Sequence, residues 1–313
     1  MLRYSLYRFG QAIFVLWAAF TVSFLLLQVM PGDAVLLKFL NPDYGLSAEQ
    51  IAQLRTTYGL DQSIVVQYFK TMGNFLQGNF GYSLQAGVPV SELIVTNLPS
   101  TFKLAGFAFL IALILAFIIA SLSVFTPFHW LKNLILAIPG LFLAIPLFWL
   151  GIIFIQIFSF QLNWISVIAP GPIEALILPV FALAIPICAP LAQVLMRSLD
   201  ELSTQPFITV LEAKGAKKLR IFYAHSLRNA ALPVLTIAGL LFGELISGAV
   251  VTETVFGLSG IGKITEQAVR SQDVSVLLSV VVISATAFVV INLVIDLLFP
   301  LIDPRLKQQR KVA

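Results

Sequence analysis

One internal stretch of this sequence, EAKGAKKLRIFYAHSLRNAALP, which runs from Glu212 to Pro233, is dense in charged side chains. Six of its residues are Lys, Arg or Glu and one is His, whereas the segments around it are almost free of charge. A basic segment of this kind can dock in a groove of another protein or lie on anionic lipid. The chemistry it offers is therefore binding.

No pattern in the sequence supports a catalytic or metal site. There is no GxxxxGK[ST] loop to cradle ATP phosphates, and neither HExxH nor GxSxG occurs. The histidines, His129 and His225, have no metal-ligand spacing, and a single cysteine, Cys188, cannot form a disulfide within the chain. No convincing pore filter is present either. The sequence predicts a protein that is not an enzyme and binds no metal or cofactor itself. It is expected to take part in transport without an energy source of its own.

The composition indicates an integral membrane protein. Of the 313 residues, 59% are hydrophobic and 11% are charged, against about 25% charged in a soluble domain. The mean hydropathy is +0.96, and the net charge of +4 is not a nucleic-acid signal. Apolar runs of the roughly 20 residues that a spanning helix needs lie at 9–30, 101–125, 134–158, 175–197, 231–252 and 275–299. The predicted fold is all-α, with six transmembrane helices and a retained first helix.

The basic residues predict the orientation. Thirteen of the 19 Lys and Arg residues lie in the N-terminal tip, the 126–133 and 197–230 loops or the C-terminal tail, and six lie in the longer loops of the other face. The positive-inside rule then places both termini in the cytoplasm and residues 31–100 outside. Within the outer segment, residues 46–60 and 63–78 have the spacing of short amphipathic helices. Such helices either lie on the bilayer or cap the bundle, or form a platform for a partner.

Proline and glycine patterns inside the spans predict bends and close packing. Prolines recur seven residues apart in the third and fourth spans, and a proline removes a backbone hydrogen bond and bends a helix. Small residues recur every four positions in the fifth span, beside an ionisable glutamate. We expect these features to line or brace a pathway, although both are also common in ordinary membrane packing. The candidates are Pro139, Pro146, Pro186, Gly239, Gly243, Glu244 and Ser247.

The charged stretch predicts two helices joined by a turn. FITVLEAKGA, from Phe207, suits a short helix that ends at Gly215, because glycine is the usual residue at a helix end. A second helix, KKLRIFYAHSLRNAAL, is then expected to run as far as Pro233.

This stretch resembles the cytoplasmic EAA loop of ABC importer permeases. Its AKGAKK…HSLRNAALPVLT wording is similar to the dipeptide/oligopeptide (and nickel) branch, although Thr209, Val210 and Leu211 stand where the letters E-A-A are expected. FGLSGIG also stands where many relatives have an aromatic-Pro-Gly. The resemblance to the B-type subunit covers nearly the whole chain, in the order MPGDAV, YGLDQSIVVQYFKTMGNFLQGNFGYSL, PVSELIVTNLPSTFKLA, VVTETVFGLSGIGK and LIDPRLK.

The resemblance implies one transmembrane permease domain of the type I importer kind over residues 1–313. It has an extracytoplasmic insertion at 31–100, a cytoplasmic coupling loop at 198–230 and a cytoplasmic tail at 300–313. The implied partners are a homologous second permease, two ABC ATPases that bind ATP-Mg, an extracytoplasmic solute-binding protein and membrane lipid, with no nucleic acid. The residues implied for the ATPase-coupling loop are Phe207, Leu211, Glu212, Ala213, Lys214, Gly215, Ala216, Arg220, His225, Arg228, Asn229 and Pro233.

The implied function is ATP-driven import across a bacterial cell (inner) membrane by a multi-pass subunit, first of all of di- or oligopeptides. Residues 204–220 would carry the motion of the ATPases to the spans. Nickel chelates, glutathione and other small polar solutes are alternatives within the same branch. A scaffold without transport and an ion channel are contrasting classes.

Overall fold

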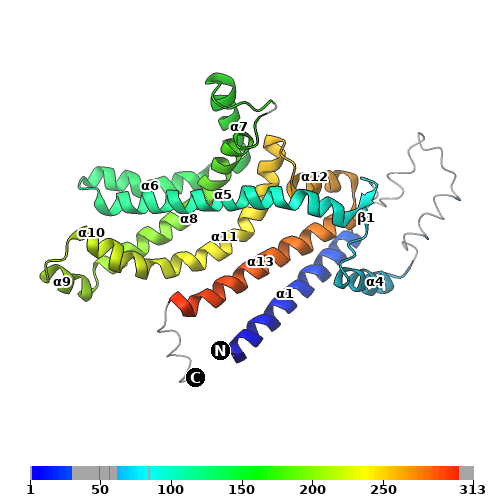
Figure 1. Ribbon diagram of the computed structural model, residues 1–313, viewed down its shortest axis with the longest axis horizontal. Coiled ribbons are helices and arrows are strands. Elements are labelled where there is room, and N and C mark those ends of the chain that lie inside the picture. The colour runs from blue at the N-terminus through cyan, green and yellow to red at the C-terminus, as the bar shows by residue number, and fades with distance from the viewer. Residues whose placement is uncertain are drawn as a thin grey trace. The chain divides into compact units, whose positions relative to one another are not determined.

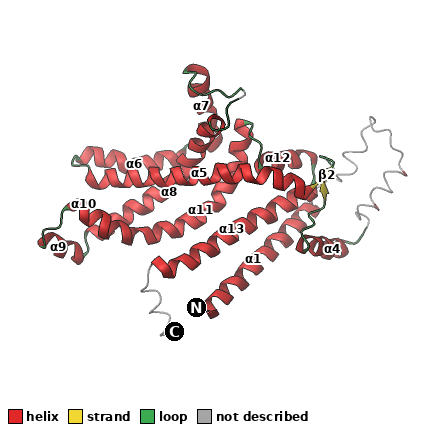
Figure 2. Ribbon diagram, viewed as in Figure 1, coloured by secondary structure: helices red, strands yellow, loops and turns green. Residues whose placement is uncertain are grey.

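The computed structural model describes residues 2–29, 49, 56, 62–83, 85–168 and 170–302. Helices dominate this part of the chain, beside one short hairpin (Figure 2). The elements are α1 (Leu2–Val29), α4 (Ile64–Leu76), β1 (Tyr82–Ser83), β2 (Val88–Pro89), α5 (Val90–Phe125), α6 (His129–Ala144), α7 (Leu147–Phe154), η2 (Ile155–Gln161), α8 (Glu174–Ser203), α9 (Pro206–Ala213), α10 (Lys218–Ile221), η3 (Phe222–Ser226), α11 (Leu227–Phe256), α12 (Ile261–Ser271) and α13 (Val274–Ile302).

The helices include enough apolar spans to confirm the predicted membrane fold. Five candidate spans occur in the described ranges, and the bent pair α6 and α7–η2 makes a sixth if it counts as one span. The five are Leu6–Gln28, Val90–Phe125, Glu174–Ser203, Lys218–Phe256 and Val274–Ile295. The chain forms two compact units: Met1–Thr101 with Gly257–Val289, and Phe102–Phe256 with Val290–Ala313.

In the first unit, α5 begins at Val90, before the apolar run that starts at residue 101. Val90 and Ile94 are buried, at 0% and 4% exposure, in a cluster that includes Ile261 of α12 and Val280 of α13. Packing of this one face stabilises helical turns that are too polar to be recognised by hydropathy. Tertiary contacts therefore lengthen the helix beyond its apolar run.

A small hairpin and two short helices accompany these spans. The strands β1 and β2 pair antiparallel in the register Tyr82↔Pro89 and Ser83↔Val88. The Ser83 hydroxyl donates to Asp273 Oδ2 at 2.7 Å, and Asp273 Oδ1 accepts the N–H of Val276 at 3.3 Å, so one buried carboxylate ties the hairpin to the first turn of α13. The second predicted amphipathic helix is confirmed as α4, whereas most of residues 46–60 lie outside the described ranges.

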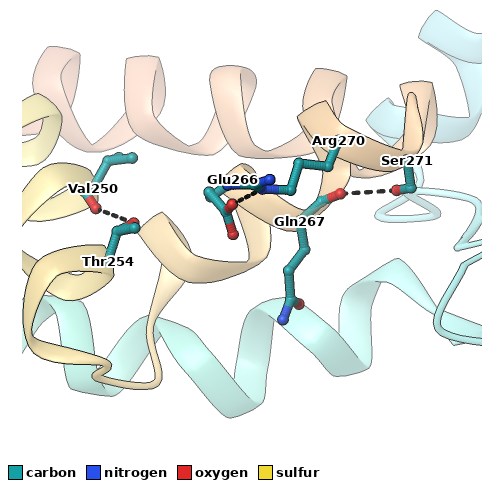
Figure 3. A network of polar contacts seen from close by, with 6 residues as sticks. All are labelled: Val250, Thr254, Glu266, Gln267, Arg270 and Ser271. Atoms are coloured by element: carbon teal, nitrogen blue, oxygen red, sulfur yellow. Dashed lines mark hydrogen bonds and ion pairs between the residues drawn. The ribbon is translucent and has the colours of Figure 1, made fainter.

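The outer surface of α12 is held by contacts one helical turn apart. Arg270 pairs with Glu266, and the Ser271 hydroxyl donates to the carbonyl of Gln267 at 2.9 Å (Figure 3). The helix ends at Gln272, which has a φ of 53°. The chain then turns into α13.

In the second unit, α8 is the central helix. It contacts α6, α7 and α11 (Figure 1), and 61% of its most apolar 18-residue stretch is buried. Glycine allows α11 to approach it closely, because a Cβ at Gly248 would lie 2.7 Å from Leu183 Cδ1. Its prolines at 179, 186 and 190 all lie inside one uninterrupted helix.

The third predicted span is interrupted at one of its two prolines. Helix α6 contains Pro139 but ends at Ala144, and α7 starts at Leu147 with a bend of 99°. Ile145 is extended, with φ −88° and ψ 119°. A residue before proline disfavours the helical conformation, so Pro146 explains the position of the break.

Candidate functional site

The start of α9 follows from its local sequence. Gln205 is extended, with φ −75° and ψ 143°, and Pro206 takes the first helical position, where its missing N–H breaks no helical bond. Ile208 is 8% exposed, whereas Val210 is 52% exposed. Helix α9 thus packs on the rest of the second unit through one side and leaves an apolar side chain exposed on another.

The end of α9 is a Schellman motif at Gly215, as the helix–glycine pattern predicts. Gly215 has a φ of 80°. Its N–H donates to the Glu212 carbonyl at 2.8 Å, and the Ala216 N–H donates to the Leu211 carbonyl at 3.0 Å. These bonds satisfy carbonyls that a helix end leaves unpaired. A Cβ at this position would meet no atom within 4 Å, so the backbone conformation, and not crowding, requires glycine.

Beyond the turn, Lys218 and Phe222 fasten the chain to the C-terminal end of α5. Lys218 Nζ donates to the Val124 carbonyl at 3.0 Å and lies 5.7 Å from the centre of the Phe125 ring. Phe222 is 3% exposed, and its ring meets Phe125 edge-on at a centroid distance of 5.0 Å. An aromatic pair of this geometry adds about 0.5–1.5 kcal/mol beyond burial. The base of the α9–α10 turn is therefore anchored.

Helix α9 covers one side of a cavity of about 480 Å³. The polar lining brings together basic residues from separate parts of the chain, Lys132, Arg197 and Lys218, with acidic Asp200 and Glu212. Protein atoms do not fill this space, so a small shift of α9 need not disrupt a close-packed core. The arrangement places α9 between an open polar space and an anchored turn.

The residues predicted for the coupling loop fall into two groups. Those from Phe207 to Arg220 lie in α9, in the turn and in α10, whereas those from His225 to Pro233 lie in η3 and α11. The prediction that Pro233 ends the second helix is wrong, because a helical stretch runs without interruption over Lys218–Phe256. A proline removes one backbone bond, and neighbouring groups of a membrane helix can compensate for that loss.

The anchoring residues Ile208, Lys218 and Phe222 are absent from the residues identified by sequence. The signal that could have found Phe222 is the apolar LRIFY run inside the basic segment, since such side chains need a surface to cover them. No comparable local signal marks Ile208 or Lys218. Ile221 and Phe222 do become buried, at 7% and 3% exposure.

The pathway candidates occupy different kinds of position. A Cβ at Gly239 would lie 2.9 Å from Ile295 Cδ1 of α13, so this part of the small-residue face packs inside the chain. Glu244 and Ser247 are exposed on α11, and Gly243 is half-buried. Of the prolines, Pro139 is buried, Pro146 is exposed and Pro186 is half-buried.

Apolar spans together with an exposed helix on an anchored turn define a multi-pass α-helical membrane protein. In the described part of the chain, no group of three His, Cys, Asp or Glu side chains could hold a metal ion. Two family models match: the binding-protein-dependent transport system inner membrane component over residues 108–308, and the N-terminal component of the same systems over residues 1–105. The chain belongs to this family and is a permease subunit of an ABC importer of the peptide family, not a catalytic subunit.

Relatives match over nearly the full chain. The oligopeptide transport system permease protein AppB of Bacillus subtilis is 35% identical, over 98% of this chain and 100% of its own length. The dipeptide transport system permease protein DppB of Alkalihalophilus pseudofirmus is 32% identical, over 98% and 100%. The glutathione transport system permease protein GsiC of Salmonella paratyphi A is 30% identical, over 98% and 99%.

A solved structure has the same fold. It is the crystal structure of an amino acid ABC transporter with histidines, which the chain matches with a TM-score of 0.54 at 16% identity. The match covers 67% of this chain and 94% of that one.

Proposed function

We propose that this chain forms half of the translocation pathway of an importer for di- or oligopeptides. Its pair is a homologous second permease, and the complex includes two ATPases that bind ATP-Mg and an extracytoplasmic solute-binding protein. The peptide assignment is supported by relatives named for oligopeptide and dipeptide transport at 35% and 32% identity. Glutathione is the second candidate, because a glutathione permease is 30% identical over a similar length.

Both termini are proposed to lie in the cytoplasm. The 13-to-6 distribution of basic residues supports this orientation. The cavity adds a structural argument, since Lys132, Arg197 and Lys218 come from three separate parts of the chain and line the same space. Residues that share one end of a bundle belong to the same side of the membrane, so their charges act together in the positive-inside rule.

Helix α9 is proposed to dock on an ATPase subunit and to carry its motion to the spans. The observation that carries this proposal is the exposed α9, ended by Gly215 and placed on an anchored turn. When ATP closes the ATPase pair, a displaced α9 would bias the spans between inward-open and outward-open states, and hydrolysis would reset them. The permease itself supplies no nucleotide site in this scheme.

Reconstitution tests the function directly. The permease pair and the ATPases, assembled in liposomes with the solute-binding protein, should take up labelled peptide only when ATP is present on the ATPase side and the binding protein on the other. Solute flux without ATP would indicate a channel. An assembled complex that hydrolyses ATP but never accumulates any tested solute would indicate a scaffold.

The substrate is tested in the same liposomes by competition. An excess of unlabelled dipeptide or oligopeptide should abolish uptake of the labelled peptide, whereas a nickel chelate should not. Uptake that only glutathione abolishes would replace the peptide assignment with the second candidate and leave the importer mechanism intact.

A further inference from the structure

Helix α4 packs on the C-terminal part of α1 through one apolar face. Tyr68 and Phe75 contact Phe20 and Phe24, with centroid distances of 5.4 Å for both the Phe24–Tyr68 and the Phe20–Phe75 pairs. The Tyr68 hydroxyl lies 2.7 Å from Thr21 Oγ1. These contacts define where α4 lies along α1 (Figure 1).

A neighbouring apolar stripe of α4 stays exposed. Val65, Phe69 and Leu76 share one side of the helix, and their exposed fractions are 64%, 61% and 83%. Lys70 is the helix's one charged residue and lies on a different side. A contiguous apolar stripe of this kind marks an interaction surface.

The packing on α1 sets the depth of this stripe in the membrane. The apolar span ends at Gln28, and Phe24 and Phe20 lie about one and two turns earlier, roughly 6 and 12 Å along the axis. Interfacial helices bury their apolar face about 5–10 Å into the boundary between headgroups and acyl chains. The polar side of α4 matches this placement, because Gln28 Nε2 donates to Gln67 Oε1 at 2.9 Å at the end of the span.

The stretch of α1 on which α4 packs also carries exposed apolar side chains on its other sides. At the same level of that helix, Val22, Leu25 and Leu26 are 55%, 51% and 65% exposed. They point away from Phe20 and Phe24, and exposed apolar side chains of a spanning helix at this depth meet acyl chains, so the level at which α4 packs is that of the hydrocarbon boundary.

We propose that α4 is an interfacial helix whose Val65, Phe69 and Leu76 side chains insert among the acyl chains of membrane phospholipids, with Lys70 at headgroup level. Its assignment to the outer leaflet rests on the orientation proposed above, whereas its depth does not. Only residues 77–81 separate α4 from β1, a reach of at most about 18 Å. In this placement the hairpin, which Asp273 ties to α13, lies near the membrane surface.

Spin labels test the depth. In a Cys188→Ala background, single cysteines at positions 65, 69 and 76 are labelled in the assembled complex in phospholipid vesicles, and Lys70→Cys is the control. Collision with oxygen, which partitions into hydrocarbon, is compared with collision with a water-soluble nickel chelate. The oxygen-to-nickel ratio should be several-fold higher at position 69 than at position 70.

Two outcomes would overturn the proposal. Ready collision with nickel at position 69 would place the stripe in water, and protection from both reagents would place it under another protein. The unmodified complex gives an independent measurement, in which phospholipids with photoactivatable acyl chains should label the α4 peptide, and absence of that adduct counts against insertion. Neither readout depends on which leaflet α4 occupies, so a wrong orientation and a wrong depth give different results.

Discussion

Replacing Gly215 by valine tests whether the end of α9 transmits motion. Gly215 has a φ of 80°, and a Cβ there would meet no atom within 4 Å. The cost therefore comes from the left-handed backbone alone, about 1–2 kcal/mol. A change of that size lowers the ratio of the native turn to alternative conformations by about 5–30-fold. The spans should still assemble, but α9 should lose its defined position.

Gly78 provides a matched control. It has a φ of 76° and also ends a helix, since its N–H donates to the Phe75 carbonyl at 3.0 Å and the Asn79 N–H donates to the Asn74 carbonyl at 2.9 Å. A Cβ there would also meet nothing within 4 Å. Gly78→Val therefore carries the same backbone cost in a segment that does not include α9.

The assay measures three quantities on one preparation: co-purification of the ATPases, ATP hydrolysis and peptide uptake. For Gly215→Val, uptake should fall sharply, with the ATPases either lost or still hydrolysing ATP without transport. Gly78→Val should retain its ATPases. The reasoning is refuted if Gly215→Val leaves all three quantities unchanged, or if Gly78→Val releases the ATPases to the same extent.

The remaining predictions concern orientation, the pathway and the hairpin. In a cysteine-free background, an impermeant thiol reagent should label a cysteine at Asn79 from outside the cell and leave one at Lys218 unlabelled, and the reverse pattern would contradict the six-span orientation. Glu244→Gln should lower uptake without affecting complex assembly, because the exposed carboxylate on α11 is proposed to face the pathway, and normal uptake kinetics would remove it from that role. Asp273→Ala should lower local stability by on the order of 2 kcal/mol, because it removes a helix cap and leaves the Ser83 hydroxyl without its acceptor. Hydrogen exchange over residues 82–89 should become faster, and unchanged exchange would show that other contacts hold the hairpin.

Local chemistry explains what the sequence alone could predict. Long apolar runs mark membrane spans because about 20 apolar residues cross the hydrocarbon core, and they must be helical because backbone polar groups are satisfied inside each segment in lipid. The structure has the expected kind of helices. The end of α9 was equally predictable, since a left-handed turn strongly favours glycine and Gly215 follows directly on a helical pattern. The second amphipathic helix, α4, could be read from its apolar spacing. Each of these features depends on residues close together in the chain.

Tertiary contacts decided the features that depend on distant residues. The two prolines of the third span look alike in sequence, yet α6 continues through Pro139 and breaks before Pro146, and α11 passes through Pro233. The start of α5 depends on burial of Val90 by α12 and α13, and the anchor at Lys218 depends on a carbonyl of α5. Spacing along the chain could not reveal these partners, because the free energy that selects them comes from surfaces that meet only after folding.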